Sequence, residues 1–301
     1  MRADLPDLLP LICPVCRRHS ERGLELSSLK LVHGRLRCQG CGHQYDLADG
    51  IPVLLRDPFT PLTALDTPEA DLLAAKGPDD APVPHAMAQL SSYLGTYVEG
   101  FEELAGKLRG RPRVGLTLEL GCGVGRGLLE LAEGSDLLLG LDRSWPMLRA
   151  ARTLFQTGRL RYARRMAGRS YAQAVVHAQP LPNVELVCGD ALDPPFAPGT
   201  FDRLVALNLL DNVRSPRALL HHLRLLAAPA AELILCSPYA WRDGIVAEGE
   251  RLGGTDPDVA LRAELDGLGF RIEDDCDLSW TLRHDARTVT VYQVHFIRAQ
   301  R

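Results

Sequence analysis

Four cysteines near the start of this 301-residue chain have the spacing of a metal site. They form two Cys-x-x-Cys pairs, Cys13 with Cys16 and Cys38 with Cys41, separated by 21 residues. Four thiolates so placed can complete a tetrahedral shell around structural Zn²⁺, leaving no open position for catalysis. In a reducing compartment such pairs bind metal more often than they form disulfides. We therefore predict a zinc ribbon whose metal is its main stabiliser.

A glycine-rich turn forms the second set of residues with chemical potential. Glu119 precedes a run in which Gly121, Gly123 and Gly125 alternate with other residues. Glycine allows a backbone to approach a ligand that a Cβ atom would block. The dinucleotide-binding pattern G-x-G-x-x-G requires glycine at the position of Arg126, so the turn favours another nucleotide-like ligand.

Two further acids, Asp142 and Asp190, each follow an apolar run. An acid at such a strand end can accept hydrogen bonds from ribose hydroxyls in nucleotide-binding folds. The apolar runs 114–120, 137–141, 184–187, 204–207 and 233–236 predict buried parallel strands, separated by helices such as 125–132 and 216–226. Residues 270–278 and 288–297 predict two closing antiparallel strands. The expected fold is α/β, a doubly wound, mostly parallel seven-stranded sheet with an antiparallel C-terminal edge, plus the small N-terminal zinc ribbon.

The domain boundaries follow from composition. Residues 1–57 hold the ribbon, 58–84 form a proline-rich acidic linker with a short helix expected near 68–75, and 85–301 contain the sheet. The chain has 34 basic and 38 acidic residues, which disfavours a uniformly basic surface. It has no apolar run of membrane-spanning length and no secretion signal at its start, so we expect a cytoplasmic protein without a membrane partner.

Taken in order, these motifs resemble those of class I, Rossmann-like, S-adenosylmethionine-dependent methyltransferases over roughly residues 90–300. The shared pattern is E-x-G-x-G-x-G, a strand-end acid, G-D-A at 189–191, and L-x-x-P-F-x-x-G-x-F-D at 192–202. The resemblance implies a methyltransferase that uses S-adenosyl-L-methionine. In it, the glycine turn contacts the methionine moiety, Asp142 the ribose, and Asp190 with Ala191 the adenine. The implied cofactor-binding residues are Glu119, Gly121, Cys122, Gly123, Gly125, Asp142, Arg143, Asp190, Ala191 and Asn208.

Residues 11–57 resemble the Trm112-like family of small zinc proteins. The resemblance rests on the second cysteine pair and on the following Tyr45, then Asp49-Gly50-Ile51-Pro52. Members of that family are partners and activators of methyltransferases, which agrees with the enzyme expected here and implies a possible protein partner for the ribbon. His33 and His43 are expected to be surface residues.

The sequence says less about the residues that bind the methyl acceptor. Asn208 and Asp211 follow the fourth strand, where they can bind the acceptor or take its proton; alternatively, Asp211 caps the next turn or helix. The Asn/Asp-Pro-Pro-Tyr/Phe motif of many base amino-group methyltransferases is absent at this point. Tyr93 and Tyr97 are expected on a helix before the first strand, where the related enzymes have a lid over the cofactor; for at least one of them, packing in the core is the favoured role. The C-terminal Trp280, Tyr292 and His295 either line the acceptor pocket or pack in the sheet.

One segment is unusually basic. It contains no acid from 143 to 184, and its arginines lie at positions 143, 149, 152, 159, 161, 164, 165 and 169. Residues 156–182 are longer than the family spacing, and apolar residues at 160, 163, 167, 171, 174 and 178 predict a basic amphipathic helix. Such a helix can bind RNA phosphates, an acidic ligand or a partner, or simply be solvated.

Three functions remain open. The combination of zinc domain and methyltransferase resembles ribosomal RNA guanine-N1 methyltransferases, whose zinc domain helps bind RNA. This ribbon is more Trm112-like and nearly neutral, so the sequence narrowly favours a small-molecule acceptor over ribosomal or transfer RNA. The third possibility is a non-catalytic cofactor-binding module of a complex.

Overall fold

The computed structural model describes residues 9–20, 23–56, 84–168 and 170–301. The helix expected near 68–75, and nearly all of the expected linker, lie outside the described residues. Within the described residues, no helix has the length and apolarity needed to cross a membrane.

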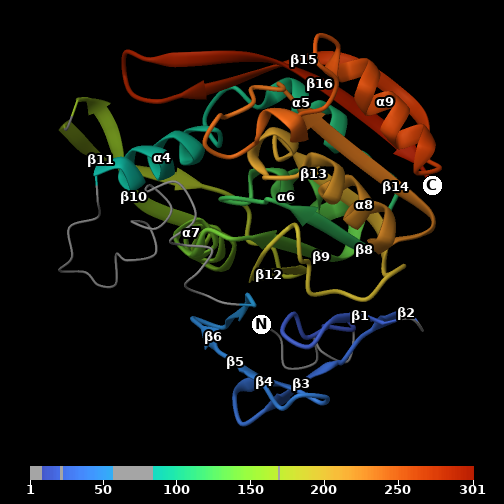
Figure 1. The fold of residues 1–301 in the computed structure, drawn as a ribbon. Helices are drawn as coiled ribbons and strands as arrows, with labels where there is room; N and C mark the ends of the chain where they lie inside the picture. Colours follow the sequence, from blue (N-terminus) through green and yellow to red (C-terminus); the bar gives the residue numbers. More distant parts are fainter. Residues whose placement is uncertain (1–8, 21–22, 57–83, 169) are drawn as a thin grey trace.

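A nine-stranded sheet forms the centre of the molecule, with the strand order β15-β16-β14-β13-β8-β9-β12-β7-β6 (Figure 1). The bounds of its strands are β6 Leu47–Ala48, β7 Ile51–Leu54, β8 Val114–Leu120, β9 Ser135–Asp142, β12 Val184–Gly189, β13 Phe201–Leu207, β14 Ala227–Ser237, β15 Arg271–Arg283 and β16 Val289–Gln300. Strands β12, β9, β8, β13 and β14 pair in parallel, whereas β16 pairs antiparallel with both β14 and β15. The expected seven-stranded arrangement with its antiparallel edge is therefore confirmed, and β7 and β6 extend it.

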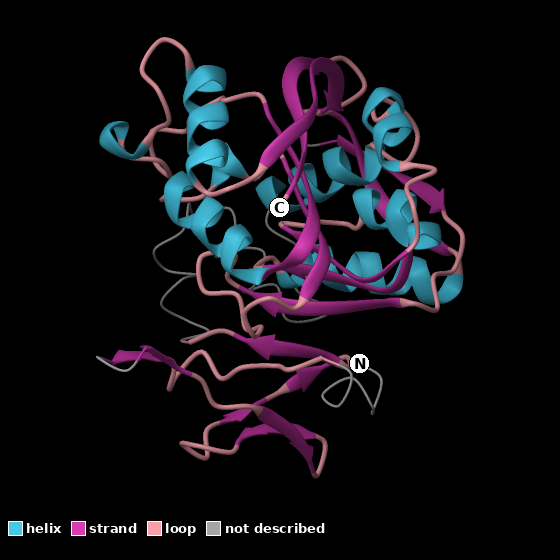
Figure 2. Ribbon diagram, turned by 90° about the vertical axis from the view of Figure 1, so that its right-hand side faces the viewer, coloured by secondary structure: helices cyan, strands magenta, loops and turns pink. Residues whose placement is uncertain are grey.

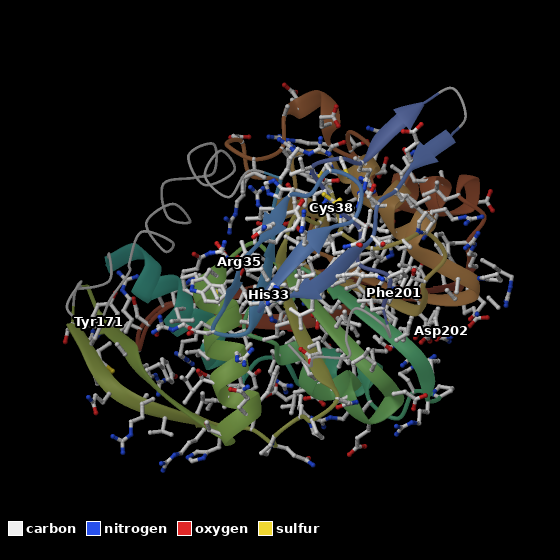
Figure 3. All side chains as sticks on the ribbon, turned by 90° about the horizontal axis from the view of Figure 1, so that it is seen from below. His33, Arg35, Cys38, Tyr171, Phe201 and Asp202 are labelled. Carbon is white, nitrogen blue, oxygen red and sulfur yellow. The ribbon has the colours of Figure 1, made fainter. Side chains whose placement is uncertain are left out.

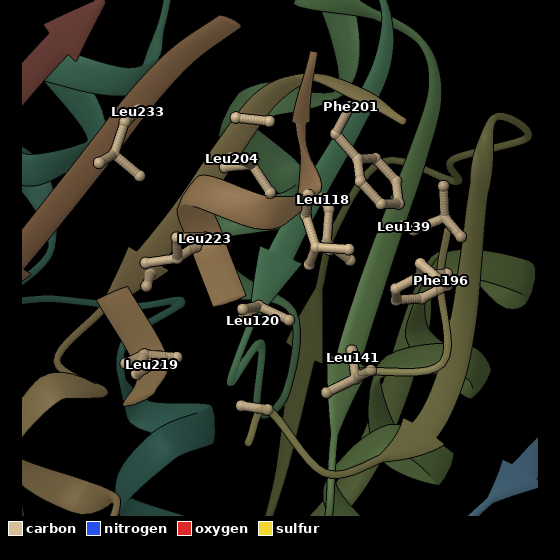
Figure 4. Close-up of a cluster of buried hydrophobic side chains, with 14 of the residues drawn as sticks. Leu118, Leu120, Leu139, Leu141, Phe196, Phe201, Leu204, Leu219, Leu223 and Leu233 are labelled. Carbon is tan, nitrogen blue, oxygen red and sulfur yellow. The ribbon is translucent and has the colours of Figure 1, made fainter. Parts of the chain in front are cut away.

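Helices cover both faces of this sheet (Figure 2). They are α4 Pro84–Gly95, α5 Glu102–Leu108, α6 Arg126–Leu131, α7 Trp145–Thr157, α8 Pro216–Leu226 and α9 Pro257–Gly267, with short 3-10 turns η1 Ala132–Gly134, η2 Leu210–Asn212 and η3 Glu248–Glu250. On one face Leu118, Leu120 and Leu141 pack with Leu219 and Leu223 of α8 (Figure 4). The sequences of the central strands are continuous apolar runs because both faces of these strands are buried in this way.

The N-terminal ribbon that holds the four cysteines is continuous with the main sheet. Its own strands are β1 Arg18–Ser20, β2 Gly23–Glu25, β3 Leu29–Val32, β4 Arg35–Cys38 and β5 Gln44–Tyr45, followed by β6 and β7. Strand β7 pairs in parallel with β12, with Val53 opposite Cys188 and Leu54 opposite Gly189. Arg17 Nη1 donates to Asp193 Oδ1 at 2.9 Å in the loop after β12. The ribbon and the sheet therefore share hydrogen bonds, an ion pair and a buried core.

The prediction of a helix in the arginine-rich insertion is wrong. Residues 159–177 form an antiparallel hairpin instead, with β10 at Arg159–Ala167 and β11 at Ser170–His177. The inward side chains Leu160, Tyr162 and Val176 follow a period of two, which the evenly scattered alanines obscured because alanine is compatible with either period. Gly168 has φ 56° and lies in the turn between the strands.

Candidate cofactor site and metal centre

The glycine turn connects the carboxyl end of β8 to α6. Gly121 and Gly123 have φ of 72° and 53°, in the left-handed region that other residues rarely occupy. A Cβ atom on Gly121 would lie 2.7 Å from Leu209 Cδ1, whereas one on Gly123 would meet no atom within 4 Å. The turn is thus closely packed at its first glycine and open at its second, where a ligand has room to approach the backbone.

Asp142, at the end of β9, is held directly against this turn. Its Oδ2 accepts a hydrogen bond from Gly123 N at 2.8 Å, and its Oδ1 accepts one from Ser144 N at 2.8 Å. Burial raises the pKa of Asp142, while these backbone N–H groups act to lower it. Each carboxylate oxygen keeps a further lone pair, so the group can still accept hydrogen bonds from a ligand.

Glu119 lies beneath the same turn and is 2% exposed. Its Oε2 has no hydrogen-bond partner among the described residues. Burial, and secondarily the nearby charge of Asp142, raise its pKa well above the ordinary value. A Cβ atom on Gly127 of α6 would lie 2.5 Å from Glu119 Oε1, so only glycine allows the helix to approach this closely.

The third strand-end acid, Asp190, follows β12. Its Oδ1 accepts a hydrogen bond from Leu192 N at 2.8 Å, and its Oδ2 lies 3.6 Å from Arg143 Nη1. Ala191 beside it is buried, as is the Cys122 side chain in the glycine turn. The predicted cofactor residues from three adjacent strands therefore meet at one edge of the sheet.

Asn208 and Asp211 follow β13 at the same edge. Asn208 has φ 52°, and its Oδ1 accepts a hydrogen bond from Cys236 Sγ at 3.3 Å. Asp211 is buried, which raises its pKa, and its Oδ1 accepts from Ser237 Oγ at 3.2 Å. Asp211 does not cap the next helix, α8. The N-cap of α8 is Ser215, whose side chain accepts a hydrogen bond from Ala218 N.

Tyr97, just after α4, contacts the glycine turn. Tyr97 Oη donates to Val124 O at 2.8 Å, and Tyr93 lies one turn earlier in α4. Arg126 has its guanidinium 4.5 Å from the centroid of Phe101 and forms an ion pair with Glu130. The arginine at this position, which distinguishes the turn from a dinucleotide-binding one, thus has a structural role.

A second polar cluster at the end of β14 contains the predicted His295, together with Tyr239 and Asp275, which sequence reasoning missed. Tyr239 has φ 52°, and its Oη lies 2.6 Å from His295 Nδ1, while His295 Nε2 lies 3.0 Å from Asp275 Oδ1. His295 is therefore buried in a hydrogen-bond network, and Trp280 and Tyr292 stack on each other with centroids 5.1 Å apart. No local sequence signal marks Tyr239, since its unusual backbone depends on contacts between distant segments.

The four ribbon cysteines come together as predicted. Their sulfur atoms all lie within 4.8 Å of one another, with 3.8 Å between Cys13 and Cys41 and 3.4 Å between Cys16 and Cys38. Tyr45 Oη lies 3.0 Å from Cys13 Sγ, and the N–H groups of Gly40 and Cys41 donate to Cys38 Sγ. These sulfur distances suit four ligands around one tetrahedral ion.

Residues 118–235 match the family model described as a methyltransferase domain. The matched segment is less than half of the chain; it begins in β8, ends in β14, and contains the glycine turn and all three strand-end acids. It therefore carries the sequence pattern of that family. No curated protein matches the sequence.

Several solved structures are similar in fold. They include YcgJ from Bacillus subtilis, at 12% identity and TM-score 0.46, covering 66% of this chain and 96% of that one. A SAM-dependent methyltransferase from Aquifex aeolicus has 16% identity and TM-score 0.45, with 72% and 98% covered. A chain from the complex of the Haloferax volcanii Trm112 methyltransferase activator with a proposed methyltransferase has 14% identity and TM-score 0.48, with 70% and 97% covered.

Proposed function

We propose that this protein is an S-adenosylmethionine-dependent methyltransferase. The observation that carries the proposal is the contact between Asp142 Oδ2 and Gly123 N at 2.8 Å, which places a strand-end acid against an open glycine turn. Asp190 on the next strand extends the same polar edge. The match of residues 118–235 to the methyltransferase domain family supports this proposal independently.

The residues present fit the cofactor. Glu119 offers a buried carboxylate oxygen without a described partner, which suits the positive charge of the cofactor's amino acid portion. The space beside Gly123 accommodates a ligand close to the backbone. When bound, S-adenosylmethionine supplies a methyl group activated by its sulfonium charge.

Each group of the chain then has a defined task. The free lone pairs of Asp142 accept the ribose hydroxyls, and Arg143 with Asp190 borders the adenine. Asn208 orients the acceptor, while the Asp211 carboxylate takes its proton, a role favoured by a pKa raised through burial. Positioning and exclusion of water, rather than a strong base, provide most of the acceleration of such a transfer.

Calorimetry with S-adenosylhomocysteine tests the cofactor site. Asp142→Ala should weaken binding at least tenfold, because two hydrogen bonds to a charged acceptor are lost, each worth about 1.5–3 kcal/mol. Asp136→Ala is the matched control, since Asp136 lies on the same strand but is exposed and paired with Arg113. Equal affinity in the two variants, or tighter binding of NAD than of S-adenosylhomocysteine, would refute the proposed site.

We also propose that Cys13, Cys16, Cys38 and Cys41 bind one structural Zn²⁺. Metal analysis of the purified chain should find about one zinc per molecule, as a closed four-thiolate site requires. The double variant Cys38→Ser/Cys41→Ser should lose it, whereas Cys276→Ser, outside the cluster, should keep it. Full zinc content in the double variant would exclude this ligand set.

A further inference from the structure

A buried histidine on β16 connects the loop after β14 to the antiparallel edge of the sheet. His295 is 5% exposed, and each of its two ring nitrogens meets one polar group. Its Nε2 lies 3.0 Å from Asp275 Oδ1 of β15, and its Nδ1 lies 2.6 Å from Tyr239 Oη. The imidazole therefore joins a carboxylate on a neighbouring strand to a tyrosine in the loop.

Asp275 is itself held from α9. Arg262 donates to both of its carboxylate oxygens, with 2.7 Å from Nε to Oδ2 and 3.1 Å from Nη2 to Oδ1. These hydrogen bonds lower the pKa of Asp275 to about 2, so this carboxylate is ionised at neutral pH. An ionised carboxylate only accepts, so His295 Nε2 carries a hydrogen. In the neutral ring, Nδ1 then accepts the hydroxyl hydrogen of Tyr239.

Tyr239 has a backbone conformation that a large side chain rarely adopts. Its φ is 52°, in the left-handed region. Such conformations persist where surrounding contacts fix them, and they cluster at functional sites. Here the contacts are the hydrogen bond to His295 and the ring of Trp241, whose centroid lies 5.9 Å from that of Tyr239. The side chain of Tyr239 therefore fixes the path of the backbone from 237 to 240.

That path brings two hydrogen-bond donors to Asp211. Tyr239 N donates to Ser237 Oγ at 3.1 Å, so the hydroxyl hydrogen of Ser237 is directed to Asp211 Oδ1, at 3.2 Å. Burial raises the pKa of Asp211, and the positive charge of Arg242 acts against this. The Ser237 hydroxyl and the backbone N–H of Ala240 also act to lower it.

We propose that Tyr239 and His295 are positioning residues for methyl transfer: they hold the loop after β14 in the path that directs its hydrogen-bond donors to Asp211. This inference rests on the proposed function, in which Asp211 takes the proton of the acceptor. Burial alone favours the protonated form of a carboxyl, which cannot take a proton. Donors aimed at its oxygens stabilise the ionised form that is needed before transfer.

The positioning pair lies away from the ribbon. In the strand order of the sheet β16 is second, whereas β7 and β6 are the last two. Seen from below, the ribbon residues His33, Arg35 and Cys38 lie on the side that faces the viewer (Figure 3). Changes to the pair therefore alter the surroundings of Asp211 without touching the cysteine cluster.

The test is an NMR titration of the full chain, isotope-labelled at its aspartate carboxyl groups, with the Asp211 signal assigned by its loss in Asp211→Asn. Tyr239→Phe removes only the hydroxyl. In this variant Asp211 should bind its proton about tenfold more tightly than in the wild type, because about one hydrogen bond to the charged carboxylate is lost. His295→Leu should have the same effect. His295→Asn should keep the wild-type titration, because its amide oxygen can accept the Tyr239 hydroxyl where Nδ1 does.

Two further variants serve as controls. Tyr162→Phe, which removes a half-buried hydroxyl from β10, should leave the titration of Asp211 unchanged. Ser237→Ala, which removes a donor itself, should move the titration at least as far as Tyr239→Phe does. A purely structural role of the Tyr239 hydroxyl would lower the melting temperature and leave the titration of Asp211 where it is.

The inference is overturned if Asp211 titrates alike in the wild type and in Tyr239→Phe, or if Tyr162→Phe moves the titration equally. Calorimetry with S-adenosylhomocysteine separates this result from a failure of the proposed function. Tyr239→Phe should bind S-adenosylhomocysteine as the wild type does, because its hydroxyl contacts His295 and not the cofactor residues. A wild-type chain that does not bind S-adenosylhomocysteine would refute the proposed function, and with it the role of this pair.

Discussion

Replacing Leu54 by alanine should destabilise the whole molecule, including the part that carries the cofactor site. Leu54 is 1% exposed, pairs with Gly189 of β12, and belongs to the buried cluster that contains Leu141. Leu→Ala at such a position costs about 2–5 kcal/mol, because the transfer energy is lost and a cavity remains. For a central value of about 3 kcal/mol, the melting temperature of a 301-residue cooperative unit should fall by about 5 °C.

Thermal unfolding is followed in two ways. The first is the far-UV circular dichroism signal, and the second is the change in melting temperature that S-adenosylhomocysteine causes. Both probes should report one transition, displaced together in Leu54→Ala. Leu225→Ala is the control, since this leucine of α8 is 41% exposed and its truncation should change stability by less than about 0.5 kcal/mol. A separate early transition of the ribbon, with the main transition unmoved, would refute the view that ribbon and sheet form one cooperative core.

Three further changes probe the interior. Gly127→Ala should lower stability by about 1–3 kcal/mol in urea unfolding, because its Cβ would contact Glu119, whereas Gly106→Ala in α5, with open space around it, should be neutral or stabilising. Glu119→Gln should gain stability relative to the wild type as the pH rises above the ordinary carboxyl range, because burial raises the pKa of the folded carboxyl and the unfolded chain therefore releases its proton first. Arg203→Met should cost about 1–3 kcal/mol for each of the two carbonyl groups that loses its buried donor, whereas Glu232 keeps its ion pair with Arg111; an unchanged urea midpoint would contradict this.

Features that are encoded locally could be predicted from the sequence. The strand Val114–Leu120 and the helix Pro216–Leu226 have the predicted bounds, because a doubly buried strand and a Pro-started amphipathic helix leave clear patterns. The four-cysteine cluster was predicted from spacing alone. The resemblance to class I methyltransferases implied that Asp142 and Asp190 serve one cofactor site, and the structure has both at the same edge of the sheet, where parallel strands end.

Features that depend on distant contacts could not be predicted. Strand β7 has only four residues, and its pairing with β12 joins positions more than a hundred residues apart. The hairpin was mistaken for a helix because its few apolar residues fit both periods, and the surface that selects the period belongs to α4 and α7. Tyr239 and Arg203 acquire their roles only through partners on other strands.

The parallel pairing of β7 with β12 has a consequence for assembly. Both strands belong to one chain, so the ribbon meets β12 at a high effective concentration. The ribbon and the sheet are also always synthesised in equal number. An edge strand of a sheet exposes unpaired N–H and C=O groups that invite other chains. Here strand β7 of the ribbon pairs with the edge of β12 within the same molecule, so a folded copy does not present that edge to its neighbours. Removal of the proposed Zn²⁺ should therefore appear first as self-association.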